Sequence, residues 1–146
     1  KNEFIIQRKC YNFHPGILPK YRGVGIFSWV IINGEKETGI TLHNIDKGID
    51  TGSVIAFKKF GIEEGDTAYS LFNKGMVSIY ELFVEQFSNI LLGEYTSTFF
   101  PKEPNSLYTR KMLEDKRNIT KLVMALDFPN KEGLYYYDDQ EGKVVL

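Results

Sequence analysis

The segment Asn12-Phe13-His14-Pro15-Gly16-Ile17-Leu18-Pro19 decides how this chain folds and where its chemistry lies. Residues 9–13 read as a strand, and Pro15-Gly16 predicts a turn directly after it. Side chains two positions apart in a strand point the same way, so Asn12 and His14 can address one pocket. An amide that donates to a developing oxyanion, beside an imidazole that titrates near neutral pH, is a candidate catalytic pair. The alternative for so short a pattern is a capping Asn followed by a surface His.

A second polar segment, Asp46-Lys47-Gly48-Ile49-Asp50-Thr51-Gly52, connects two predicted strands at residues 38–45 and 53–60. Its composition is typical of turns. On the first strand, Ile40 and Leu42 share one face, while Thr41 and His43 share the other. The chain has only two histidines, His14 and His43, and each lies near a turn-rich segment. Because a carboxylate can orient an imidazole, we expect Asp50 to approach His14.

A long amphipathic helix is predicted over residues 67–92, with Asp66 as its cap and Gly93 as its stop. Apolar residues repeat at helical spacing and predict core packing: Leu71, Phe72, Ile79, Phe83, Phe87, Ile90 and Leu91.

Shorter elements surround this helix. We expect a helix at residues 25–32, a surface connection at 96–111, a helix at 119–127 and a hairpin at 133–146. The order of elements suits one half of an α/β sheet better than a complete doubly wound domain.

Composition limits the possible roles. The chain has 146 residues and 42% hydrophobic content, which is enough for one domain with a core. Its net charge of -1 provides no overall field for nucleic acid or an anionic membrane. A single cysteine, Cys10, suits a reducing compartment, and no apolar run approaches the ~20 residues that span a bilayer. We therefore expect a cytoplasmic protein without membrane contact.

The two ends of the sequence suggest a fragment, because the first residue is Lys1 and the last residues resemble an unfinished strand.

Several ordered segments resemble the folate-dependent formyltransferase family. They are residues 12–23, Trp29, Asn33-Gly34, Gly39-Ile40-Thr41-Leu42-His43 and Ile49-Asp50-Thr51-Gly52, with 36 positions from His14 to Asp50. The similarity covers residues 8–60, and the later elements fit the region that follows. It implies the carboxyl-terminal half of a Rossmann-like formyltransferase domain, followed by a short helix and a β-hairpin. Residues 1–93 would be a partial catalytic core without its upstream half, and 94–146 a linker, helix and hairpin extension.

The resemblance also implies roles for individual residues. Asn12 would hold the formyl oxygen and stabilise the oxyanion, and His14 would assist with that charge and with proton transfer. Asp50 would orient His14 and help to take the proton from the attacking amine. The donor would be 10-formyltetrahydrofolate, with no metal. Its pterin head would meet the loop formed by Ile45, Asp46, Lys47, Gly48 and Ile49.

Three further residues are candidates for contact with the acceptor. Lys20 and Arg22 could meet a phosphate, or they could be solvated loop charges. His43 would face the same cleft, or be a satisfied strand histidine. Trp29 is expected in the core. Gly16 replaces a small polar residue that several family branches carry after His-Pro, which weakens the case for acceptor contacts at that point.

The family resemblance leaves the acceptor amine open. Arg22-Gly23 is followed by Val24-Gly25-Ile26-Phe27, whereas the methionyl-tRNA branch often continues with Ala-Ala-Pro. The segment resembles sugar N-formyltransferases more closely, so the predicted acceptor is a nucleotide-linked amino sugar. Initiator methionyl-tRNA is the first alternative, although the near-neutral charge disfavours tRNA. A non-catalytic fragment or pseudoenzyme of the same fold is the second. A homodimer is compatible with either.

Overall fold

The computed structural model describes residues 9–101, 106–109, 124–125, 135–138 and 142–145. Both helices and strands are present, which confirms the α/β class. In chain order the elements are β1 (Tyr11–Pro15), β2 (Arg22–Gly23), α2 (Ile26–Ile32), β3 (Glu37–Asn44), β4 (Val54–Gly61), α3 (Ala68–Leu92), β5 (Leu107–Tyr108), β6 (Tyr135–Asp138) and β7 (Gly142–Val145).

The central sheet has the order β1-β3-β4, and both of its strand pairs are antiparallel. Doubly wound sheets are mostly parallel, but the short loop between β3 and β4 permits only antiparallel pairing. The predicted division of faces on β3 is confirmed, because Ile40 and Leu42 join the hydrophobic core. On the opposite face, Thr41 bonds to the loop that follows β1. The sheet therefore separates a core face from a polar face.

Strand β1 begins two residues later than predicted and extends through Pro15, which pairs with Ile40. The register also places Asn12 opposite His43 and His14 opposite Thr41. Both Asn12 and His14 consequently lie within the strand, on its polar face, whereas the predicted strand ended at Phe13.

Helix α3 has nearly its predicted length, but its cap is Thr67 and not Asp66. Thr67 and Ser70 form reciprocal side-chain-to-backbone bonds, which is a capping box. The Asp66 carboxylate instead accepts from the backbone of Glu63 and from the Ser70 hydroxyl. Gly93 ends the helix with φ of 72° as predicted.

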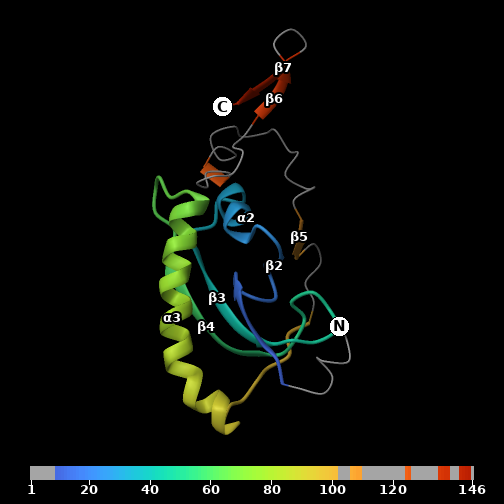
Figure 1. Cartoon of the computed structure of the whole chain (residues 1–146), viewed down its shortest axis with the longest axis vertical. Helices are drawn as coiled ribbons and strands as arrows, with labels where there is room; N and C mark the ends of the chain where they lie inside the picture. The colour runs from blue at the N-terminus through green and yellow to red at the C-terminus, as the bar shows by residue number, and fades with distance from the viewer. Residues whose placement is uncertain (1–8, 102–105, 110–123, 126–134, 139–141, 146) are drawn as a thin grey trace.

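The core lies between the sheet, α2 and one face of α3. Trp29 is buried there as expected, together with Leu71. The predicted packing of the whole apolar stripe of α3 is wrong, however, because Phe72, Phe83, Phe87 and Leu91 are 41–73% exposed. Figure 1 shows α3 along one face of β3 and β4, with its outer side turned away from the sheet.

The carboxyl-terminal region contains one element that the sequence patterns missed. Strand β5, only two residues long, pairs in parallel with β2 inside the predicted surface connection. Strands β6 and β7 form the predicted antiparallel hairpin, which lies at one end of the long axis (Figure 1). The helix predicted at 119–127 lies outside the described residues except for Met124 and Ala125, which are helical. Among the helices of the described ranges, none is long and apolar enough to cross a membrane.

Candidate active site

The polar face of the sheet gathers the histidines and Asn12. Because Asn12 and His43 are cross-strand partners, their side chains lie on one face, and Asn12 Nδ2 is 3.2 Å from His43 Nε2. His43 Nδ1 lies 2.8 Å from the carbonyl oxygen of Asn44, so Nδ1 carries a proton and donates it. Nε2 faces both the amide of Asn12 and the carboxylate of Asp50. The second N–H of that amide remains for a ligand oxygen.

His14 lies behind this pair with its side chain 3% exposed. Its Nε2 is 2.6 Å from the carbonyl oxygen of Tyr21, and a carbonyl can only accept, so Nε2 holds the proton. The other nitrogen, Nδ1, lies 3.5 Å from Asp50 Oδ2. Protonation of Nδ1 would therefore form an ion pair with Asp50. Nδ1 can accept a proton that reaches the site.

Asp50 closes the site from the loop between β3 and β4. Its backbone is in the left-handed region with φ of 49°, which an Asp tolerates better than most residues. One carboxylate oxygen accepts from the backbone N–H of Gly23 at 2.8 Å, and the other lies 3.6 Å from His43 Nε2. With 14% of its side chain exposed, Asp50 is more accessible than either histidine. Asn12 and Asp50 thus form the part of the site that an incoming molecule meets first.

Burial and charge set the protonation states. Burial lowers the pKa of His14, and it outweighs the negative charge of Asp50 and the bond to Tyr21, which act in the opposite direction. Burial alone would raise the pKa of Asp50, but the neighbouring His43, His14 and Gly23 N–H outweigh it and hold that pKa below its ordinary value. Near neutral pH the site therefore presents a neutral His14 beside an ionised Asp50.

The loop predicted to meet the pterin head is folded on itself. The Asp46 carboxylate accepts from the Gly48 N–H at 2.9 Å and from the Thr51 hydroxyl at 2.6 Å. At the two ends of the predicted pterin-binding stretch, the side chains of Ile45 and Ile49 are exposed. The loop that carries Asp50 therefore presents two apolar side chains to solvent, and Lys47 is exposed as well.

The structure separates the three candidate acceptor residues. His43 belongs to the site, as described above. Arg22 lies beside it, since Nη1 is 3.4 Å from the carbonyl oxygen of Ile49 and Nε is 3.0 Å from the Ser106 hydroxyl. Lys20 is not brought to the site, because its ammonium lies 2.6 Å from the carboxylate of Glu35.

Three contributors to the site escaped the sequence patterns. Tyr21 and Gly23 act through backbone groups, which residue types do not reveal. Thr41 bridges the loop after β1, since its hydroxyl donates to the carbonyl of Gly16 and accepts from the N–H of Leu18. The available signals were the position of Tyr21-Arg22-Gly23 within the family-like segment and the predicted placement of Thr41 on the same strand face as His43.

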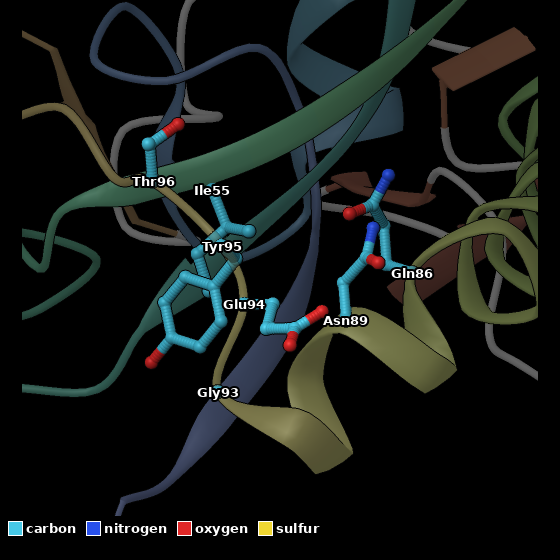
Figure 2. Close-up of a pocket in the computed structure, with 7 residues that line it drawn as sticks. All are labelled: Ile55, Gln86, Asn89, Gly93, Glu94, Tyr95 and Thr96. Carbon is cyan, nitrogen blue, oxygen red and sulfur yellow. The ribbon is translucent and has the colours of Figure 1, made fainter.

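Two other observations concern metal binding and a second hollow in the molecule. Within the described residues, no group of three or more His, Cys, Asp or Glu side chains could hold a metal ion. A separate hollow of about 470 Å³ lies at the carboxyl end of α3 and contains none of the predicted site residues. Figure 2 shows this hollow between Tyr95 on one side and Asn89 and Gln86 on the other.

Two sequence relatives and one solved structure show which known proteins this chain resembles. The chain is 49% identical over 70 residues to a GDP-perosamine N-formyltransferase of Brucella melitensis, a match that spans 48% of this chain and 27% of that protein. It is 52% identical over 65 residues to the methionyl-tRNA formyltransferase of Caldanaerobacter subterraneus, spanning 44% of this chain and 21% of that protein. The chain therefore matches only about a quarter of the length of these relatives.

The solved structure is the N-formyltransferase of Helicobacter canadensis, in complex with folinic acid and dTDP-3-aminofucose. It superposes with a TM-score of 0.74 at 32% identity, over 81% of this chain and 47% of that chain. The formyl transferase family model matches residues 4–86, which contain β1, β3, the Asp50 loop and most of α3. The chain therefore belongs to the formyl transferase family.

Proposed function

We propose that this chain supplies the catalytic residues of an enzyme that transfers a formyl group from 10-formyltetrahydrofolate to a primary amine on a nucleotide-linked amino sugar. The observation that carries the proposal is the convergence of Asn12, His14 and Asp50, with His43, on one face of the sheet. The family relatives that act on sugars, and the neighbour with a folate and a sugar nucleotide bound, support the choice of donor and acceptor.

The chemistry follows from the geometry. The neutral amine attacks the formyl carbon, the new C–N bond forms, and the formyl oxygen becomes an oxyanion. The free N–H of Asn12 suits that oxyanion, because such a donor strengthens as negative charge develops. The amine nitrogen then loses a proton toward the ionised Asp50, with Nδ1 of His14 available to hold it. Collapse breaks the bond between the formyl carbon and the folate nitrogen, which takes up one proton.

The donor would lie against the loop formed by residues 45–49. Its exposed apolar side chains can cover an aromatic head, while Asp50 at the end of the same loop faces the transferred group. Arg22 lines a small hollow together with Asp50, and its guanidinium donates to the carbonyl of Ile49, so we assign it a phosphate-proximal role.

The outer side of α3 supports a catalytic unit larger than the described residues. The apolar face of a helix is normally buried, yet many large apolar side chains of α3 are exposed. We therefore propose that residues 1–93 form part of a larger catalytic core. A cytoplasmic location and a homodimer remain predictions, and methionyl-tRNA remains the alternative acceptor.

Formyl transfer assayed with the full-length protein tests the proposal. The protein is incubated with 10-formyltetrahydrofolate and a panel of nucleotide-linked amino sugars, with methionyl-tRNA as the competing acceptor. We expect formylation of an amino sugar, and a loss of about 10²–10³ in kcat for Asn12→Ala. Lys20→Ala is the matched control, because Lys20 pairs with Glu35 away from the site. Formylation of methionyl-tRNA alone would establish the alternative acceptor. Unchanged rates in Asn12→Ala and Asp50→Ala would disprove the catalytic assignment.

A further inference from the structure

The segment that follows α3 returns across the end of the central sheet. After Gly93 ends the helix, Thr98 forms a bridge with Val54, the first residue of β4, through two backbone bonds of 2.8 Å. The chain between these points, residues 94–97, therefore passes close to the ends of the loop that carries Asp50.

Tyr95 makes the first of two side-chain links. Its hydroxyl lies 3.1 Å from the hydroxyl of Tyr11, and their rings meet edge to face at 5.9 Å. The same hydroxyl lies 3.5 Å from Asn44 Oδ1, at the limit of a hydrogen bond. Figure 2 shows the hydroxyl of Tyr95 directed away from Asn89 and Glu94. Tyr95 thereby contacts both strands that present the site, one residue from Asn12 and one residue from His43.

Ser97 makes the second link. The amide of Asn44 donates to the Ser53 hydroxyl at 2.9 Å, and that hydroxyl donates to the Ser97 hydroxyl at 3.0 Å. The N–H of Asn44 also donates to the carbonyl of Ser53 at 2.9 Å. Asn44 and Ser53 flank the loop of residues 45–52, so both ends of the loop are bonded to each other and to the segment after α3.

These links reach the site through the backbone. Side chains alternate along β1 and β3, so Tyr11 and Asn44 point to the α3 side while Asn12 and His43 point to the site. The hydrogen bond with Tyr95, aided by burial, raises the pKa of Tyr11 to about 12, so this hydroxyl stays neutral over the pH range of an assay. Deprotonation of Tyr11 therefore does not disrupt the contact in that range.

We propose that Tyr95 and Ser97 are positioning residues for formyl transfer, which fix the loop of Asp50 and the strand pair of Asn12 and His43 from the opposite face of the sheet. This role rests on the proposed function. A displacement of about 1 Å in reacting groups can cost about a hundredfold in rate, so a fixed loop matters for kcat. Substrate contacts are untouched, so KM should change little.

Tyr95→Phe removes one hydroxyl and keeps the ring, and Ser97→Ala removes the other. In the full-length protein we expect kcat to fall about ten- to a hundredfold with KM nearly constant, and Ser97→Thr to restore the rate. Tyr95→Phe combined with Tyr11→Phe should be no worse than Tyr95→Phe alone, because Tyr95→Phe already removes the bond between the two hydroxyls. Tyr80→Phe is the control, since Tyr80 is 70% exposed on α3.

Backbone hydrogen exchange decides the proposal independently of activity. We expect faster exchange of the amides in residues 45–52 for Tyr95→Phe and Ser97→Ala, with exchange along α3 unchanged. Unchanged exchange in the loop overturns the proposal, as does a fall in kcat that Tyr80→Phe reproduces. If wild-type protein transfers no formyl group to any acceptor, the proposed function fails. Faster exchange in the loop would then still support the link.

Discussion

His14 shows how one residue can be held in a chosen state. Its Nε2–H is committed to the carbonyl of Tyr21, so only Nδ1 can change its protonation, and Nδ1 faces Asp50. Burial keeps that nitrogen free of a proton near neutral pH, against the pull of Asp50. His14 Nδ1 is thus unprotonated near neutral pH, and the adjacent carboxylate of Asp50 would stabilise its protonated form.

This arrangement predicts the titration of His14. Its imidazole should titrate in NMR spectra with a midpoint below the ordinary value of 6.5. In Asp50→Asn the midpoint should fall further, because the charge of Asp50 raises the pKa of His14. With only two histidines in the chain, His14→Asn assigns the signal directly.

The same shift has a consequence for stability. The unfolded chain binds a proton at His14 more readily than the folded chain, so the free energy of unfolding should fall as pH drops below 6.5. His14→Asn should lose this part of the pH dependence, as urea titrations between pH 5 and 7.5 can measure. Glu81→Gln, on the exposed side of α3, serves as the charge control. A midpoint at or above 6.5, or an upward shift in Asp50→Asn, would contradict this account.

At the scale of elements, strand β3 connects the core to the site. Gly39 lies where β3 passes closest to its neighbours, and an added Cβ would stand 2.2 Å from the carbonyl oxygen of Lys58 and 2.7 Å from Ile17. Gly61 lies in the same strand pair, yet no atom stands within 4 Å of its added Cβ. The two glycines therefore form a matched pair for testing how tightly the sheet is packed.

Gly39→Ala should lower the free energy of unfolding by about 1–3 kcal/mol, because backbone atoms cannot yield to the methyl group. Gly61→Ala should change it by no more than about 0.5 kcal/mol, or raise it slightly through the unfolded state. Urea unfolding followed by circular dichroism measures both. Equal effects of the two substitutions would show that the close approach at Gly39 does not limit packing.

The elements also show what sequence patterns can predict. The 3.6-residue spacing located α3, and alternation located the two faces of β3, because both follow from local geometry. The Asn12–His43 contact depends on the register of β1 against β3, which no local pattern sets. Strand β5 escaped because two residues in a Pro-rich segment carry no periodicity. The links of His14 and Asp50 to Tyr21 and Gly23 escaped because backbone groups are the same in every residue.

For the whole molecule, the sequence correctly predicted an apolar stripe on α3 but not which part of it the described fold would bury. Leu71 and Leu82 face the sheet, whereas Tyr80, Val84 and Leu91 do not. Hydrophobic spacing shows that a helix has apolar faces, while the number of layers that cover them depends on the rest of the molecule. The same holds for the site. Residue types indicated which residues form it, but not how deeply their side chains are buried.

The exposed side of α3 should govern how the 146-residue chain behaves in solution. Apolar patches of this kind bind hydrophobic dyes and promote association. Val84 on α3 and Val24 on the loop before α2 are both 57% exposed. The same substitution can therefore be made on the apolar side of α3 and away from it. Val84→Lys should reduce self-association in sedimentation velocity and lower the fluorescence of a bound naphthalene sulfonate dye. Val24→Lys should leave both near the wild-type values. Because neither side chain is buried, the free energy of unfolding should change by no more than about 0.5 kcal/mol in each. Identical behaviour of the two variants would show that the apolar side of α3 does not drive association.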